Sequence, residues 1–123
     1  MNVILENILK TNYSFFNEDI EFNCGDGWFN ILSDFAHAVW HLIDANVMLA
    51  DFKISAVESQ FGELTIYHNE SGPVIRNLER EAARESRHTC EICGNPGMNR
   101  STDDIVNTYC QMHYVEWVIN TFK

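Results

Sequence analysis

The fold of this chain is decided by residues 90–113, which read C-E-I-C-G-N-P-G-M-N-R-S-T-D-D-I-V-N-T-Y-C-Q-M-H. This stretch holds two pairs of metal-ligating residues, Cys90 with Cys93 and Cys110 with His113, and 16 residues separate the pairs. A C-x2-C turn brings two sulfurs to the same side, and a second pair roughly 15–20 residues later closes a tetrahedral site. The sequence therefore predicts one structural Zn2+ per chain, held by Cys90, Cys93, Cys110 and His113.

Turn-forming and apolar residues predict the local structure around both pairs. They indicate a loop after the first pair, then a short strand, then a helix that begins at the second pair. The residues that carry this pattern are Gly94, Pro96, Gly97, Ile105, Val106, Tyr109, Val115, Val118, Ile119 and Phe122. We therefore expect a treble-clef-like (zinc-ribbon-like) zinc module at residues 89–123, which fixes the C-terminal helix against the helix that precedes Cys90.

Two alternatives to the zinc site follow from the residues alone. The cysteines could be buried small hydrophobes or disulfide partners, although a reducing compartment favours metal ligation. His88 could replace His113 as the fourth ligand, with poorer spacing. Cys24 is expected to be a packed thiol, because the other four residues already fill a tetrahedron.

Residues 1–88 predict an α/β body, so the fold class is α+β and residues 1–123 form a single domain. Apolar periodicity predicts helices at 3–9, from Trp28 to about Asn46, and from 73 to about 88. Gly25 and Gly27 permit a tight turn, and Asp26 can cap the helix that follows. Alternation between 52 and 68 predicts a β-hairpin, with His68 at the surface of its end.

His37 and His41 lie four residues apart on the polar face of the second helix, with Asp34 and Asp44 nearby. This spacing places both imidazoles on one side of the helix. The pair could hold a metal or serve acid–base chemistry. An ordinary solvated polar face is the alternative, and the chain lacks the H-E-x-x-H motif that would favour metal binding.

The charge of −10 is unevenly spread. Residues 1–70 carry eleven acids against Lys10 and Lys53, a balance of −9. This charge could attract a partner protein with a basic surface, and solubility alone is the alternative. Asp34 and Asp44 are the candidate acidic contacts. The 46% hydrophobic content argues against disorder. We expect neither a signal peptide nor a membrane segment, and therefore a cytoplasmic location and no membrane partner.

Four arginines form a basic stripe on the helix before Cys90 and offer an alternative function. Arg76, Arg80, Arg84 and Arg87 fall four, four and three residues apart, with glutamates between them. This spacing is compatible with a nucleic-acid-binding zinc protein, or with an ordinary solvated helix face. A nucleic-acid-binding surface is usually more basic than this one.

Three segments together resemble an uncharacterised family of small proteins of bacteria and their phages. They are C-G-D-G-W-F-N-I-L at 24–32, Q-F-G-E-L-T-I-Y at 60–67, and C-E-I-C-G-N-P-G with C-Q-M-H after it. The resemblance covers about residues 22–113 and implies the fold and a phage-like setting in a bacterial host cell. This chain departs from the family in Glu58, Gln60 and Thr65, which replace expected basic residues and argue against phosphate binding.

Catalysis is not expected. Four protein ligands leave no open zinc position, and the H-x-E, nucleophile-elbow and phosphate-loop motifs are missing. We therefore expect a small acidic, zinc-stabilised protein-binding module. Its resemblance implies a phage-type inhibitor of a host protein, such as an anti-CRISPR or anti-restriction protein that imitates nucleic acid toward a defence nuclease.

Overall fold

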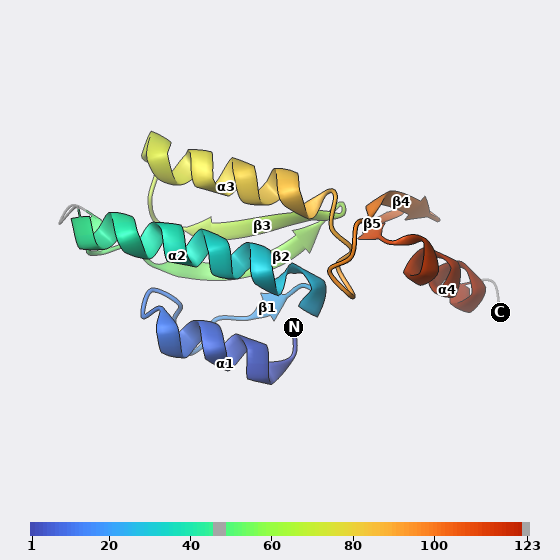
Figure 1. The fold of residues 1–123 in the computed structure, drawn as a ribbon, viewed down its shortest axis with the longest axis horizontal. Coiled ribbons are helices and arrows are strands. Elements are labelled where there is room, and N and C mark those ends of the chain that lie inside the picture. Colours follow the sequence, from blue (N-terminus) through green and yellow to red (C-terminus); the bar gives the residue numbers. More distant parts are fainter. Residues whose placement is uncertain (46–48, 122–123) are drawn as a thin grey trace.

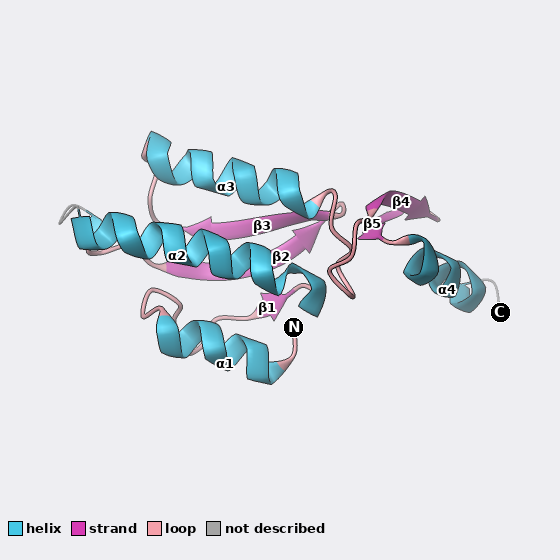
Figure 2. Ribbon diagram, viewed as in Figure 1, coloured by secondary structure: helices cyan, strands magenta, loops and turns pink. Residues whose placement is uncertain are grey.

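The computed structural model describes residues 1–45 and 49–121 and has an α+β fold. Figure 1 shows an elongated molecule with a three-stranded body at one end and a small hairpin–helix unit at the other. The helices are α1 (Val3–Asn12), α2 (Phe29–Ala45), α3 (Pro73–Ser86) and α4 (Gln111–Thr121), and a short 3-10 helix, η1, spans Asp26–Trp28. The strands, coloured in Figure 2, are β1 (Phe22–Asn23), β2 (Ile54–Gln60), β3 (Glu63–His68), β4 (Met98–Thr102) and β5 (Ile105–Tyr109).

The body is a sheet of order β1-β2-β3 with helices α2 and α3 on one face (Figure 1). Strands β1 and β2 are parallel, whereas β2 and β3 are antiparallel with Val57 opposite Ile66. These two side chains are buried beneath the helices, as the alternating pattern requires. The opposite face carries Glu58, Gln60 and Tyr67, and Gln60 donates hydrogen bonds to the other two side chains. One side of the sheet therefore forms the core and the other meets solvent.

The core is aromatic and aliphatic and belongs almost entirely to the body. Trp28, Leu32, Val39, Ile54 and Val57 are fully buried, and a cluster of phenylalanines fills the space between α1, α2 and the sheet. The clustered rings are Phe15, Phe16, Phe22 and Phe52. Burial of this apolar surface is the main stabilising contribution to the body.

The predicted hairpin is confirmed, and its turn consists of Phe61 and Gly62. Both residues have positive φ, at +53° and +75°, as a two-residue primed turn requires. Asn-Gly is the usual sequence for such a turn. Phenylalanine at the first position is unfavourable, and its side chain is 81% exposed.

Several local predictions for the body were wrong. Asp26 is not an N-cap: it lies inside η1, whose N-cap is Gly25, and its carboxylate accepts the N–H of Asn2 at 2.6 Å. Trp28 lies in η1, one residue before α2, and the predicted helix end at Asn46 falls outside the described residues. His68 is not a surface residue: its side chain is 7% exposed and its Nε2 lies 2.7 Å from Glu79 of α3.

Helix α4 packs on the β4–β5 hairpin (Figure 1). The prediction that it lies against α3 was therefore wrong. The ring of Trp117 packs edge-to-face against Tyr109 of β5. The guanidinium carbon of Arg100 on β4 lies 4.6 Å from the ring centroid of Tyr114. The chain therefore turns outward after Cys110, and α4 projects from the body. Of the apolar residues that predicted this helix, Phe122 lies outside the described residues.

Candidate metal centre

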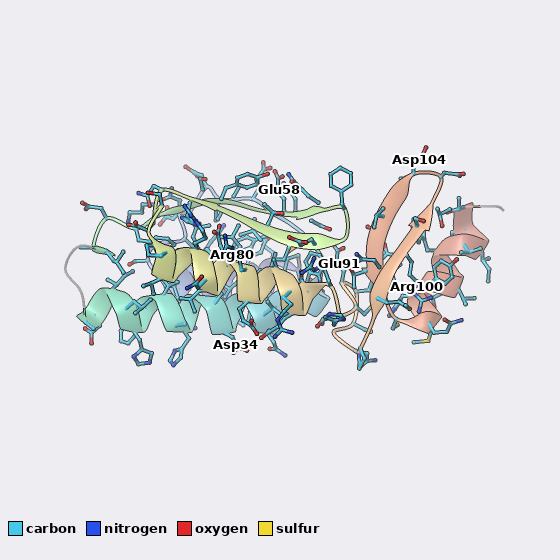
Figure 3. The ribbon with its side chains drawn as sticks, turned by 90° about the horizontal axis from the view of Figure 1, so that it is seen from above. Asp34, Glu58, Arg80, Glu91, Arg100 and Asp104 are labelled. Carbon is cyan, nitrogen blue, oxygen red and sulfur yellow. The ribbon has the colours of Figure 1, made fainter. Side chains whose placement is uncertain are left out.

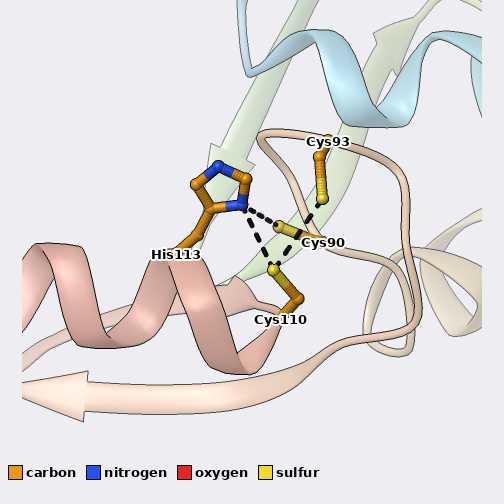
Figure 4. Close-up of side chains that lie close together, drawn as sticks. All are labelled: Cys90, Cys93, Cys110 and His113. Atoms are coloured by element: carbon orange, nitrogen blue, oxygen red, sulfur yellow. Dashed lines mark hydrogen bonds between the residues drawn. The ribbon is translucent and has the colours of Figure 1, made fainter.

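Four side chains converge at the junction between the loop after α3 and the start of α4 (Figure 4). Cys90, Cys93, Cys110 and His113 each present one ligand atom, and these atoms all lie within 4.8 Å of one another. His113 Nδ1 is 3.5 Å from Cys90 Sγ and 3.2 Å from Cys110 Sγ, and Cys93 Sγ is 3.8 Å from Cys110 Sγ. This group could hold a metal ion, and it contains all four ligands predicted from the sequence.

The backbone around the first pair explains its geometry. Gly94 donates its N–H to the Cys90 carbonyl at 2.9 Å, and the Cys90 N–H donates to Asn95 at 2.7 Å. Gly94 has a φ of +80°, which glycine adopts without steric cost. These bonds form a tight turn that brings the thiols of Cys90 and Cys93 to the same side.

The second pair is placed by the end of the β4–β5 hairpin and the first turn of α4. Cys110 directly follows β5, and its carbonyl accepts the N–H of Tyr114 at 2.9 Å. His113 then lies within the first helical turn and faces back toward the thiols (Figure 4). The loop that holds Cys90 and Cys93 is thus followed by the β4–β5 hairpin and then by α4.

Backbone N–H groups make two of the thiols more acidic. Burial acts to raise the pKa of Cys90, but N–H groups of the ligand loops outweigh it, so that the pKa is lowered. The His113 N–H likewise lowers the pKa of Cys110. A metal ion binds the thiolate form, so these bonds favour the state that ligates.

The turn before α2 contacts the C-x2-C loop closely through hydrogen bonds. Gly27 donates its N–H to the Glu91 carbonyl at 2.8 Å, and Trp28 Nε1–H donates to the Thr89 carbonyl at 2.9 Å. A Cβ on Gly27 would overlap the Cys90 carbonyl and lie 2.6 Å from the Gly94 nitrogen. Gly27 is therefore needed for close approach, and it does not have the positive φ that would demand glycine in a turn.

Glu91, inside the C-x2-C turn, is a buried carboxylate that joins the body to the metal loop (Figure 3). It accepts the Gly25 N–H at 3.1 Å and the Ser59 hydroxyl at 3.1 Å. Burial raises the pKa of Glu91, and these two hydrogen bonds oppose the rise. Local sequence patterns do not predict this role of Glu91, because its partners lie 66 and 32 residues away.

A second contact joins the two hairpins. The buried Thr108 hydroxyl donates to the Gly62 carbonyl at the tip of β2–β3 and also contacts Asn99 at 2.7 Å. The Glu91 N–H donates to the Thr108 carbonyl at 2.9 Å. The metal loop, β5 and the tip of the body hairpin therefore form one connected unit.

The remaining predicted site residues lie away from the metal cluster. Cys24 is buried in the core, and burial raises its pKa to about 12, in agreement with the predicted packed thiol. His88 is exposed and does not belong to the cluster. Asp34 and Asp44 are exposed on α2, and Figure 3 places Asp34 and Glu58 on opposite sides of the molecule.

The arginine stripe lies on α3, with Arg87 at the C-cap of that helix, and three of its members have partners within the chain. Arg84 pairs with Glu81, Arg87 Nη1 lies 3.5 Å from Glu63, and Arg76 Nη2 donates to the Ser71 carbonyl at 3.1 Å. Arg80 lines a shallow groove between α3 and β3 that also includes Glu63 and Glu79. Carboxylates therefore accompany the positive charge along this stripe.

Within the part of the chain that the structure describes, no helix is both long and apolar enough to cross a membrane. No family model, curated protein or solved structure matches this chain.

Proposed function

We propose that the metal is a structural Zn2+. The C-x2-C loop, the β4–β5 hairpin and α4 would then form a treble-clef-like module. In a tetrahedron with zinc–sulfur bonds near 2.3 Å and zinc–nitrogen bonds near 2.0 Å, sulfurs lie about 3.8 Å apart and sulfur–nitrogen pairs about 3.5 Å. Cys93 and Cys110 are separated by 3.8 Å and Cys90 and His113 by 3.5 Å, whereas Cys110 and His113 are closer, at 3.2 Å. Four protein ligands leave no position for substrate or water, which supports a role in stability and not in catalysis.

We further propose that the protein is a non-catalytic module that binds another protein. The exposed apolar side chains of α4 are the main support for this function. The structure describes all residues of α4, from Gln111 to Thr121, and none of them is buried. Met112, Val115 and Ile119 are 59%, 42% and 56% exposed and recur at steps of three and four residues. This spacing aligns them along one outward face of the helix, which we call the α4 face.

The α4 face has the pattern of a helix that docks into an apolar groove. Apolar side chains clustered on a surface are typical of protein interaction sites, whereas single exposed ones need no explanation. Met98 and Ile105 on the supporting hairpin are also more than half exposed. The metal centre would hold α4 in the orientation that presents these side chains.

The acidic charge supports the kind of partner that we propose. Asp103 and Asp104 form the tip of the β4–β5 hairpin, and Figure 3 places Asp104 on the same side of the molecule as Glu58. A host or phage protein with an apolar groove and a basic surface would complement this module. The family resemblance extends the proposal to a phage-type inhibitor of a defence nuclease, acting in the bacterial cytoplasm.

A pull-down from bacterial lysate with matched variants of the zinc-loaded protein tests the binding role. We expect Val115→Asp to abolish retention of the partner, because it places a charge in the α4 face. Val74→Asp on α3 is the matched control, since Val74 is 53% exposed and outside that face. Specific retention that is unchanged by Val115→Asp, or no specific retention at all, would reject the proposal.

Nucleic-acid binding through Arg76, Arg80, Arg84 and Arg87 is the alternative that a gel shift at low salt tests. The carboxylates near these arginines disfavour it. A shift that is lost in the Arg80→Glu, Arg84→Glu double variant would favour nucleic acid as the partner. We expect no shift.

A further inference from the structure

Outside the metal centre, His37 and His41 form a close pair of exposed imidazoles on α2. Their Nε2 atoms are 3.1 Å apart, and the ring planes are nearly perpendicular, at 89°. Both side chains point to solvent from a helix of 17 residues, so the backbone fixes their separation. This distance allows a hydrogen bond between the N–H of one imidazole and the ring nitrogen of the other.

The separation also suits a shared metal ion. Metal–nitrogen bonds of about 2.0–2.1 Å, with angles between 90° and tetrahedral, place two nitrogens about 2.9–3.4 Å apart. The observed 3.1 Å lies within that interval. A small rotation of the rings would direct both lone pairs to one ion, and the ion would replace the shared proton.

The surrounding charge favours a cation at this pair. Asp34 precedes His37 by three residues and Asp44 follows His41 by three, so all four share one side of the helix. Helix α2 contains no lysine or arginine. From the neighbouring α3, Glu85 lines the same groove as Asp34, whereas Glu81 in that groove is paired with Arg84. These carboxylates raise the local concentration of divalent cations.

We propose that His37 and His41 form a second metal site, separate from the Cys3His centre, that binds Zn2+, Ni2+ or Cu2+. Imidazole selects these borderline ions over Mg2+ and Ca2+. Two protein ligands leave the remaining positions to water, so the ion exchanges readily and binds more weakly than at a site with four protein ligands. Helix α2 leads away from the metal centre (Figure 1), so the two sites can fill independently.

Calorimetric titration of protein that already holds one zinc tests this site with Zn2+ alone. We expect one further equivalent to bind in the micromolar range, and either His37→Ala or His41→Ala to weaken that step at least tenfold. The matched control is His88→Ala, another exposed histidine, which should leave the step unchanged. Mg2+ should produce no binding heat.

Circular dichroism and the zinc content of each variant separate loss of the site from loss of the fold. The imidazole 15N chemical shifts of His37 and His41 should move together on zinc addition. The proposal is wrong if the zinc-loaded protein takes up no second equivalent. It is equally wrong if the second equivalent persists unchanged in His41→Ala.

Discussion

The backbone N–H of Gly27 donates to the carbonyl of Glu91 at 2.8 Å, which joins the turn before α2 to the C-x2-C loop. A Cβ at Gly27 would meet backbone atoms of Cys90, Glu91 and Gly94. The metal loop therefore packs directly against the body and is not joined to it by a linker alone.

Gly27→Ala should lower the free energy of unfolding by about 3 kcal/mol, because an added methyl group displaces backbone that cannot yield. Urea unfolding followed by tryptophan fluorescence measures this change. Gly72→Ala is the matched control, since a Cβ there meets only the flexible Glu70 side chain. Equal effects of the two substitutions would contradict the close seating of the metal loop.

Removal of the metal should unfold the hairpin–helix unit before the body. Its apolar contacts are few, whereas the core cluster belongs to the body. We expect about one zinc per purified chain, with the zinc lost and helical circular dichroism reduced in Cys93→Ser. Cys24→Ala should keep the zinc. A metal-free protein with an unchanged amide NMR spectrum would argue against a structural ion.

Stability should fall as the pH rises between 9.0 and about 12, because the folded pKa of Cys24 is raised to that upper value from 9.0. In this interval the unfolded chain loses the thiol proton while the folded chain keeps it. The loss contributes up to about 1.4 kcal/mol per pH unit. Cys24→Ala should remove this contribution from a series of urea unfolding curves. An identical pH slope in the variant would contradict the burial of this thiol.

Phe61→Asn should stabilise the protein by about 1 kcal/mol, because asparagine tolerates a positive φ that phenylalanine resists. The exposed ring contributes little burial that would offset this gain. Phe61→Val should destabilise, since β-branched residues fit the left-handed region worst. Thermal unfolding of the three proteins should rank asparagine above phenylalanine above valine, and the reverse order would disprove the strain.

The metal ligands, the helices α1, α2 and α3 and the β2–β3 hairpin were predictable from short-range spacing in the sequence, whereas β1 and η1 were not predicted. The C-x2-C and C-x2-H pairs predicted the metal cluster, alternation predicted the β2–β3 hairpin, and apolar periodicity predicted α1, α2 and α3. Phe61-Gly62 completed the hairpin as a two-residue turn despite an unfavourable first residue. Local patterns were sufficient for these features.

The contact between the metal loop and the body depends on residues far apart in the sequence. The bonds from Gly25 to Glu91 and from Trp28 to Thr89 span 66 and 61 residues, and no local pattern encodes such pairs. The glycines at 25 and 27 could be interpreted from sequence as a turn, yet both lie close against the metal loop. The direction of α4 was also mispredicted, because packing of Tyr109 on Trp117 fixes it and helical periodicity does not.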